Sequence, residues 1–499
     1  MIPKFPPISS STSTDVLIVG GGITGITSAY LLAKEGKSVT LIDASHLVGG
    51  TSLHTTAKVT VQHGLCYDQL INNSDFNTAK TYLQVNQAAA KFIEGLVHTN
   101  AIECDYEKNK AVIFSTSGEY ETKIEKEKQA YDHLNLKGTI ETSIPYNLDI
   151  QNALQLPDQA QFNPTKYLSF LVQELIKMNV TIYENTKATA VKESEENVEV
   201  TCETGHSITA NHVIISSHYP FYEGAKFLFA RMYANKSYVI AFPAINSPDH
   251  GMYVSVDKPV RSIRQTTING EDFILFGGES HKVGQGDDIS KHYQALTRSA
   301  ESVFGKVNVQ YHWSAQDYVT EDQLPFIGPL HQDRPRTLVA TGYRKWGMTN
   351  STAAAMMLTD KILERPNTDL EIFKPTRFNL KASAKQIIRE NVDVTKHFIK
   401  GKIDFPKNKI DQLQPDEATT FLKDGQRTGA YKDDEGQVHV VDTTCTHMGC
   451  EVNWNDAERT WDCPCHGSRF SYEGKVIEGP AQEALKKHDY TIKDVYSKE

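Results

Sequence analysis

The chain has 499 residues, which is more than one compact domain usually holds, so two or three domains are expected. Hydrophobic residues make up 39% and charged residues 23%, enough to bury a large core. The net charge of −10 argues against nucleic-acid binding, because phosphate recognition needs a basic face. No apolar run reaches the roughly 18 residues of a membrane helix, and the start of the chain does not resemble a signal peptide. We therefore expect no membrane segment and a cytoplasmic location.

Hydrophobic periodicity predicts alternating strands and helices over the first three quarters of the chain. Strands are expected at residues 15–20, 38–43, 180–183, 188–192, 197–202, 207–209, 212–216 and 337–341, and residues 236–278 are rich in strand patterns. Helices are expected at residues 26–35, 76–98, 120–135, 163–178 and 350–363. The first strand, helix and strand form a βαβ unit.

A G-x-G-x-x-G motif joins the first strand to the first helix of this unit. Its glycines are Gly20, Gly22 and Gly25, and Asp43 ends the second strand. Glycines at these places allow a tight turn, close approach of a pyrophosphate and close helix packing. Asp43 can accept a hydrogen bond from a ribose hydroxyl; a solvated strand-end carboxylate is the alternative interpretation. The motif and its context predict a dinucleotide site at the helix N-terminus.

A domain boundary is predicted after the last helix. Residues 1–365 form the first expected domain. Residues 366–402 are charged, with little strand patterning, and are interpreted as a linker. From residue 403 to 499 short alternating runs and turns predict an all-β domain.

Four of the seven cysteines lie close together in this last domain, at positions 445, 450, 463 and 465. Such clustering suggests a metal site before a disulfide scaffold. Cys445-x-His447 and Cys463-x-x-His466 supply two thiolates and two imidazoles, the set that a Rieske [2Fe–2S] cluster needs. Tetrahedral zinc could use the same residues, but the extra cysteines and the glycines of both motifs favour the cluster.

Residues 403–499 resemble Rieske proteins of the respiratory and photosynthetic type. The resemblance implies a disulfide between Cys450 and Cys465 that ties the two ligand loops together, and a Ser468 hydroxyl that hydrogen-bonds a bridging sulfur. Residues 479–481 resemble the loop that covers the cluster. Phe470 stands where high-potential members carry a hydrogen-bonding tyrosine, so we expect a potential below that of the respiratory proteins.

Residues 15–363 resemble the amine- and amino-acid-oxidizing flavoproteins of the D-amino-acid oxidase superfamily. The stretches that carry the resemblance are residues 49–52, 163–164, 211–218, 324–329 and 340–349. It implies FAD as the cofactor, and an α/β fold in which a Rossmann-like FAD domain holds an inserted mixed-sheet substrate domain. The FAD contacts that it implies are Gly50, Thr51, Gly342, Gly347, Met348 and Thr349. Residues 347–349 lie just before the helix expected at 350–363, and the positive N-terminal end of that helix would lie at the flavin pyrimidine edge.

Three further groups of residues are interpreted through this resemblance. His54 lies where some relatives bond a histidine covalently to the flavin; a noncovalent histidine beside the cofactor is the alternative. Arg264 and His281 are the catalytic candidates of the substrate domain. Tyr253 and Arg261 are considered with them, because an arginine can clamp a carboxylate, although most arginines lie on the surface.

The two predicted sites together suggest an enzyme that oxidizes an amine or an N-substituted amino acid. Electrons would pass from FAD to the cluster and then to an external one-electron acceptor. Two alternatives stay open: a reductase with the opposite electron flow, for which no second G-x-G-x-x-G is visible, and a non-enzymatic redox sensor. A Rieske oxygenase is excluded, because too little chain follows His466 for a mononuclear iron site.

Overall fold

The structure is a computed structural model. It describes residues 2–224, 226–244, 249–286, 288–377, 391–399, 401, 410 and 413–488. The chain forms two compact units, which are described separately below. The first comprises Met1–Phe227, Ser237–Ser280 and Tyr293–Ala384, and the second comprises Leu228–Lys236, His281–His292 and Lys385–Glu499.

The first unit contains a largely parallel sheet in the order β16-β17-β10-β1-β2-β7, with β8 and β9 attached through β10. The strands are β1 (Thr12–Val19), β2 (Val39–Ile42), β7 (Thr181–Tyr183), β8 (Ala188–Glu193), β9 (Val198–Cys202), β10 (Ser207–Ile215), β16 (Phe326–Pro329) and β17 (Thr337–Thr341). β1 pairs in parallel with both β2 and β10. The apolar second half of β1 is fully buried, as expected for a strand covered on both faces.

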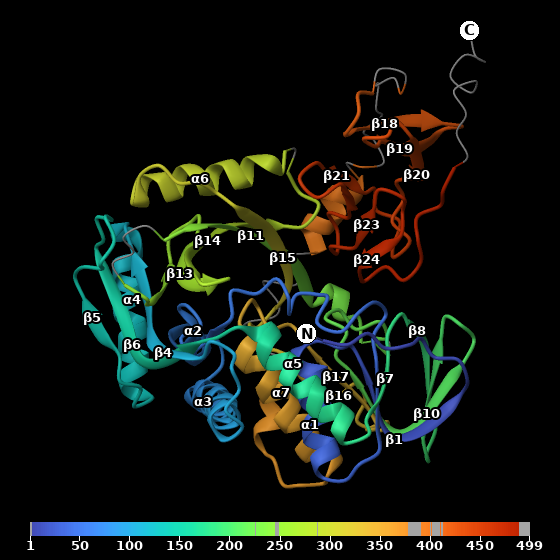
Figure 1. Ribbon diagram of the computed structural model, residues 1–499, viewed down its shortest axis with the longest axis horizontal. Helices are drawn as coiled ribbons and strands as arrows, with labels where there is room; N and C mark the ends of the chain where they lie inside the picture. Colours follow the sequence, from blue (N-terminus) through green and yellow to red (C-terminus); the bar gives the residue numbers. More distant parts are fainter. Residues whose placement is uncertain are drawn as a thin grey trace. The chain divides into compact units, whose positions relative to one another are not determined.

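Helices α1 (Ile23–Lys34), α5 (Pro164–Lys177) and α7 (Gly347–Ile362) pack beside this sheet, with α1 in contact with the other two (Figure 1). The Asn163 side chain accepts a hydrogen bond from Lys166 N and so caps α5, which explains why the helix begins at Pro164. The other helices are α2 (Cys66–Asn73), α3 (Phe76–Thr99), α4 (Gly118–His133) and α6 (Ser290–Phe304).

A second, mixed sheet has the order β15-β11-β14-β13-β12-β4-β6-β3, with β5 paired to β6. Its strands are β3 (Lys58–Val59), β4 (Glu107–Ser115), β5 (Thr139–Glu141), β6 (Asn152–Gln161), β11 (Met232–Pro243), β12 (Met252–Ser255), β13 (Arg261–Ile268), β14 (Glu271–Lys282) and β15 (Tyr311–Thr320). β12 pairs in parallel with β4 and antiparallel with β13. The two sheets confirm the predicted α/β class with a mixed second sheet.

The carboxyl-terminal part of the second unit has two small antiparallel sheets, as predicted for an all-β domain. One consists of β18 (Glu417–Lys423), β19 (Gln426–Lys432) and β20 (Val438–Asp442). The other consists of β21 (Asn453–Asn455), β22 (Thr460–Asp462), β23 (Arg469–Ser471) and β24 (Val476–Glu478). Trp461, Phe470 and Val452 are buried together in its core.

Several predicted elements differ from the observed ones. α1 and α7 each begin three residues earlier than predicted, at Ile23 and Gly347. One strand, β10, replaces the two expected at 207–209 and 212–216. Residues 391–399 are helical within the predicted linker, of which residues 378–390, 400 and 402 lie outside the described residues. α2 and α6 were not predicted.

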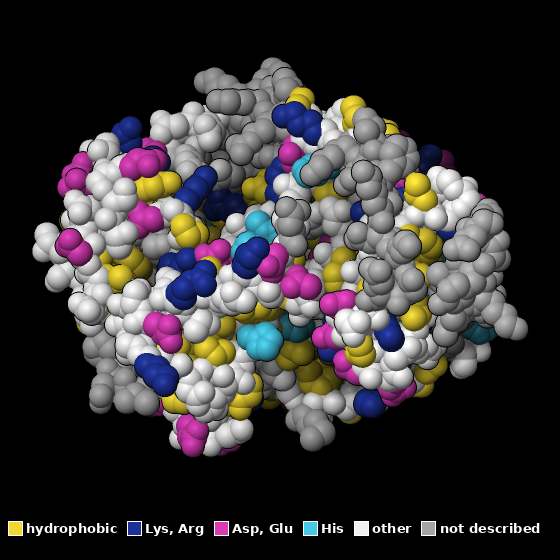
Figure 2. All heavy atoms as spheres, turned by 90° about the horizontal axis from the view of Figure 1, so that it is seen from above, with side chains coloured by type: hydrophobic (Ala, Val, Ile, Leu, Met, Phe, Trp, Pro, Cys, Tyr) yellow, Lys and Arg dark blue, Asp and Glu magenta, His cyan; other side chains and the backbone are white. Residues whose placement is uncertain are grey.

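The surface carries both signs of charge. On the face that Figure 2 shows, the coloured Lys and Arg side chains are interspersed with Asp and Glu. Within the described residues, no helix has the length and apolar character needed to cross a bilayer.

Candidate flavin and iron–sulfur sites

Two glycines shape the turn between β1 and α1. Gly20 has a φ of +112°, and a Cβ on it would lie 2.5 Å from the Ser216 carbonyl oxygen. A Cβ on Gly25 would lie 1.9 Å from the Gly20 carbonyl oxygen. Only glycine therefore fits these two positions, while Gly22 caps α1 without a side chain. This open backbone at a helix N-terminus fits the pyrophosphate of a dinucleotide.

Asp43 holds the loops around this turn. Its Oδ2 accepts a hydrogen bond from Gly21 N at 2.7 Å, and its Oδ1 accepts one from Ser45 N at 2.8 Å. Burial raises the pKa of the Asp43 carboxyl, and the two amide hydrogen bonds partly oppose that rise. Each oxygen keeps a second lone pair, so the ribose contact predicted for Asp43 stays a prediction beside this structural role.

The turn that begins at Gly50 is tied to β15. The Thr51 hydroxyl donates to the Gln316 carbonyl at 3.1 Å, and the Trp313 indole donates to the His54 carbonyl at 3.0 Å. The half-buried His54 ring has its Nδ1 3.0 Å from the Gly50 carbonyl oxygen. These contacts fix the position of the loop, whereas a covalent bond between His54 and the flavin stays a prediction.

Helix α7 begins at Gly347 with an uncapped first turn. Trp346, the residue before it, makes no side-chain hydrogen bond to the helix amides. Gly342, with a φ of +80°, lies in the loop that leads from β17, and Met348 and Thr349 are buried. Free amides at a helix N-terminus stabilise negative charge, so this end of α7 fits the predicted flavin contact.

A buried histidine beside α7 was not predicted. His63 Nδ1 lies 2.7 Å from the Tyr82 hydroxyl, Nε2 lies 2.8 Å from the Thr60 carbonyl, and the ring stacks on Trp346. Burial, and then the charge of Arg344, lower the pKa of His63 to about 3, so its ring is neutral. A single histidine has no spacing signal, and the sequence therefore could not single it out.

Arg264 is buried among acceptors of its own chain. Its Nε donates to Gln161 Oε1 at 2.9 Å, and its Nη1 donates to the Thr56 carbonyl. Burial lowers the pKa of Arg264 to about 10, and the more distant Glu107 and Asp105 oppose this shift. A bidentate clamp on a substrate carboxylate would cost Arg264 these hydrogen bonds.

Lys58 lies beside Arg264 and was not predicted either. Its Nζ donates to the Ser262 hydroxyl at 2.8 Å and to the Thr56 hydroxyl at 3.0 Å. Burial, and then the charge of Arg264, lower the pKa of Lys58 to about 7. In the described part of the chain, neither cation has a carboxylate as a hydrogen-bond or ion-pair partner. This cation pair therefore suits an anionic ligand.

Tyr253 and Arg261, the other candidates on this sheet, are both paired. The Tyr253 hydroxyl donates to Asp249 at 2.7 Å, and Arg261 Nη2 donates to Glu279 at 2.5 Å. Both side chains therefore stabilise the sheet around them.

His281, the second catalytic candidate, belongs to the second unit, whereas Arg264 belongs to the first. Its ring stacks on His292 with 4.5 Å between centroids, and burial lowers its pKa to about 4. These contacts give no support to a role for His281 in substrate chemistry, which stays an untested prediction.

Two loops of the second unit carry the four predicted cluster ligands. Cys445 and His447 follow β20, and Cys463 and His466 follow β22. The Cys445 and Cys463 thiols are buried and hydrogen-bond each other, which lowers the pKa of Cys445 to about 7. A thiolate is therefore accessible at neutral pH, as metal binding requires.

The two imidazoles meet beside these thiols. The His447 and His466 ring centroids lie 4.9 Å apart, with an interplanar angle of 90°. Burial lowers the pKa of His447 to about 4 and that of His466 to about 3, so both rings are neutral. His447 Nδ1 is buried without a hydrogen-bond partner among the described residues, and a metal ion would satisfy it. Two thiols and two neutral imidazoles fit a Rieske [2Fe–2S] cluster.

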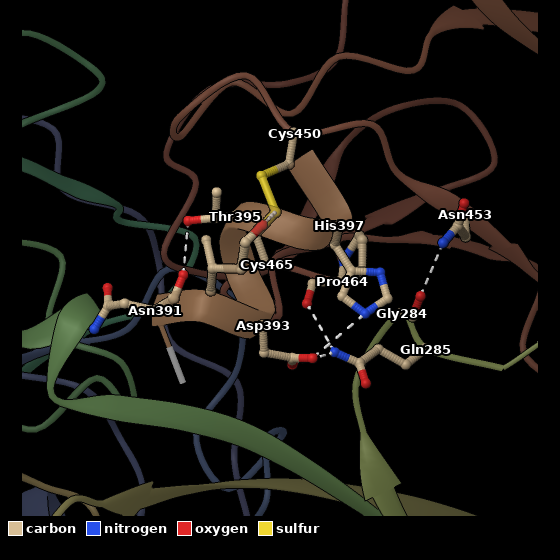
Figure 3. The surroundings of a disulfide bond; sticks show 11 residues. Gly284, Gln285, Asn391, Asp393, Thr395, His397, Cys450, Asn453, Pro464 and Cys465 are labelled. Carbon is tan, nitrogen blue, oxygen red and sulfur yellow. Dashed lines mark hydrogen bonds and ion pairs between the residues drawn. A yellow bond between two sulfur atoms is a disulfide. The ribbon is translucent and has the colours of Figure 1, made fainter. Parts of the chain in front are cut away.

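A disulfide joins Cys450 of the first loop to Cys465 of the second, as predicted (Figure 3). The Cys463 sulfur lies within 4.8 Å of both disulfide sulfurs, but these are bonded to each other and offer no thiolate. Helical residues 391–399 lie beside the disulfide, where Asp393 accepts a hydrogen bond from Gln285 at 2.9 Å. The disulfide therefore leaves Cys445 and Cys463 as the free thiols of the two loops.

Ser468 and Phe470 complete the surroundings of the ligands. The Ser468 hydroxyl accepts a hydrogen bond from Ala481 N at 3.0 Å and so holds the loop at residues 479–481. Phe470 is fully buried and has no hydroxyl to donate. The lower potential expected from Phe470 stays a prediction.

Comparison with known proteins covers both parts of the chain. The sequence model of the FAD dependent oxidoreductase family matches residues 15–361, and that of the Rieske [2Fe-2S] domain matches residues 405–489. The chain is 44% identical over 489 residues to the "Putative Rieske 2Fe-2S iron-sulfur protein YhfW" of Bacillus subtilis (strain 168). That alignment covers 98% of this chain and 96% of the relative.

Solved structures share the fold of the first part. Glycine oxidase from Geobacillus kaustophilus superposes with a TM-score of 0.62 at 18% identity, covering 73% of this chain and 99% of the oxidase. L-proline dehydrogenase from P. horikoshii superposes with a TM-score of 0.63 at 15% identity, covering 74% of this chain and 98% of the dehydrogenase.

Proposed function

Because this chain belongs to the FAD dependent oxidoreductase family and carries a Rieske [2Fe-2S] domain, we propose that it oxidizes an amine or an N-substituted amino acid and passes the electrons to the cluster and then to an external one-electron acceptor. When bound, FAD supplies hydride acceptance and the cluster supplies one-electron transfer. The substrate loses a hydride from carbon and a proton from nitrogen to give an imine, which water hydrolyses. Two one-electron acceptor molecules are reduced for each substrate oxidized.

The observation that carries this proposal is which segments of the chain make up the second unit. Residues 228–236 and 281–292 lie within the match to the FAD dependent oxidoreductase family. They nevertheless form one compact unit with residues 385–499. Lys236 has only 1% of its side chain exposed there and forms an ion pair with Glu458. Such packing supports electron exchange within the chain and argues against two independent modules joined by chance.

The cation pair of Lys58 and Arg264 supports an amino acid over a simple amine. A substrate carboxylate would supply the negative charge that the pair lacks. Lys58 is the better contact, because it is only partly buried and bonds to hydroxyls that a carboxylate can replace. Arg264 then contributes through its charge, which raises the positive electrostatic potential at Lys58 without direct contact with the substrate.

Anaerobic bleaching of the flavin tests the proposal. The panel pairs N-substituted amino acids with the amines that lack the carboxylate. We expect bleaching by at least one amino acid and little by its decarboxylated partner. K58M should raise the concentration needed by tenfold or more, roughly the loss of one charge-assisted contact, while K58R retains most binding. The proposal fails if no compound bleaches the flavin, and the carboxylate assignment fails if both members of each pair bleach it equally.

A further inference from the structure

The Phe229 ring packs edge-on against both imidazoles of the predicted cluster site. Its centroid lies 5.2 Å from that of His447 and 5.2 Å from that of His466, with interplanar angles of 79° and 83°. Phe229 belongs to the short helix η1 (Leu228–Ala230), inside the FAD dependent oxidoreductase match. On this side, each imidazole therefore meets a carbon surface that the flavoprotein sequence provides.

The space between Phe229 and His466 leaves little room for water. A cavity of about 20 Å³ lies beside His466, which is large enough for about one water molecule. Its apolar lining includes Phe229, Met232, Val283, Val394 and Pro464. His466 itself is only 7% exposed. Truncation of the Phe229 ring would join its volume to this cavity and admit further water.

Two contacts hold the flavoprotein segments in this position. Lys236, seven residues after Phe229, forms the buried ion pair with Glu458. Gly284 approaches the second ligand loop so closely that a Cβ on it would lie 2.5 Å from Pro464 N, and its carbonyl accepts a hydrogen bond from Asn453 at 2.9 Å (Figure 3). The segment that carries Phe229 is thus held by the Lys236 ion pair, and Val283 N of the Gly284 segment donates to its Ala234 carbonyl at 3.3 Å.

We propose that Phe229 closes the histidine side of the cluster site, excluding bulk water and external redox proteins from His447 and His466. This face of the cluster is then closed by a residue of the same unit, and the external acceptor docks elsewhere. The inference rests on the proposed function only for the existence of that acceptor. The shielding itself requires no substrate.

Shielding has a consequence for the redox potential with a definite sign. Two ferric ions, two sulfides, two thiolates and two neutral imidazoles carry no net charge, and one added electron makes the assembly an anion. Water stabilises an anion more than a phenyl ring does. Phe229 should therefore lower the midpoint potential, and its removal should raise it.

The test compares F229A with F227A in the full-length, cluster-loaded protein. Phe227 is a matched control, because it is a phenylalanine two residues before Phe229 with 59% of its surface exposed. Dithionite titration followed by EPR gives the midpoint potential, and electron spin echo modulation in D₂O reports deuterons near the cluster. We expect F229A to raise the potential, deepen the deuterium modulation and speed reoxidation by ferricyanide several-fold. F227A should match the unmodified protein.

F229L keeps the site testable if F229A fails to retain the cluster, since leucine preserves most of the apolar cover. It should give smaller changes in the same direction. Unchanged potential and modulation in F229A would overturn the proposal, and so would equal changes in F227A. Deep deuterium modulation in the unmodified protein, comparable to that of a Rieske protein with exposed histidines, would overturn it without any variant. None of these measurements uses a substrate. If no compound of the panel bleaches the flavin, the proposed function fails, but the measurements on F229A still decide whether Phe229 shields the cluster site.

Discussion

Replacement of Arg469 by methionine should destabilise the cluster-binding unit far more than its single charge suggests. The Arg469 guanidinium on β23 lies among three carboxylates: Asp462 at 3.3 Å, Glu478 at 3.3 Å, and Glu458, with which it also forms a short contact. Only 11% of the Arg469 side chain is exposed. R469M would remove this cation from all three carboxylates, while Glu458 would keep its ion pair with Lys236.

The size of the effect follows from burial. Removal of one partner from a buried ion pair costs about 3–5 kcal/mol, because the remaining charge stays desolvated. Such a loss raises local opening, and with it backbone hydrogen exchange, by roughly two to three and a half orders of magnitude. Hydrogen exchange mass spectrometry of β22 and β23 in the full chain measures this directly.

Arg459 provides the matched control, because it also pairs with two carboxylates but at the surface. Its Nε lies 2.7 Å from Asp416 and its Nη1 3.4 Å from Asp434, with 44% of its side chain exposed. Exposed ion pairs contribute only about 0–1 kcal/mol, so R459M should leave exchange almost unchanged. Equal effects of R469M and R459M would refute this reasoning.

The same network predicts a pH dependence. Burial alone would raise the pKa of Asp462, but the charges of Arg469 and Lys236 outweigh it, and the pKa lies below its ordinary value. The stability that this lowered pKa provides is present above the unfolded-state pKa of about 3.9 and is lost as the pH falls through the folded-state value. The R469M deficit should therefore be largest near neutral pH and shrink as the carboxylates protonate in acid.

Three further measurements address separate features. The double substitution C450S/C465S removes the cross-link between two residues with a sequence separation of 15. It should lower the free energy of unfolding, measured by urea titration, by about 3 kcal/mol, because the unfolded chain gains conformational entropy. Because the pKa of Lys58 is about 7, binding of acetate, followed by the flavin absorbance, should be constant below pH 7 and weaken about tenfold per pH unit above it. K58R should abolish that dependence, and its persistence in K58R would assign it to another group. Acid precipitation separates the two interpretations of His54: a yellow pellet indicates the covalent flavin bond, and a colourless pellet indicates the noncovalent contact.

Features encoded by short spacing were predictable from the sequence. The turn around Gly20 and Gly25 is dictated by backbone contacts over a few residues, so the motif and the geometry agree. The Cys450–Cys465 disulfide was likewise inferred from the resemblance of the two ligand loops to Rieske proteins, and it is confirmed. The turn depends on local chain geometry that a pattern of residue types records directly, whereas the disulfide pairing was implied by the family resemblance.

Features that depend on contacts between distant parts of the chain were not predictable. Lys58 on β3 meets Ser262 on β13, although the two strands are not neighbours in the sheet and the residues are 204 positions apart. Phe229 reaches the two imidazoles from a segment assigned by sequence to the first domain. Neither residue has a spacing signal, since its partners are set by tertiary packing.

The central claim is that electrons from the substrate pass from FAD to the iron–sulfur cluster within one chain. Its most direct test mixes oxidized, fully loaded protein anaerobically with a substrate found in the bleaching panel, and freezes samples over milliseconds to seconds for EPR. The account predicts a reduced-cluster signal that grows after the flavin bleaches and approaches about one spin per chain. A flavin that bleaches completely while the cluster stays oxidized would contradict it.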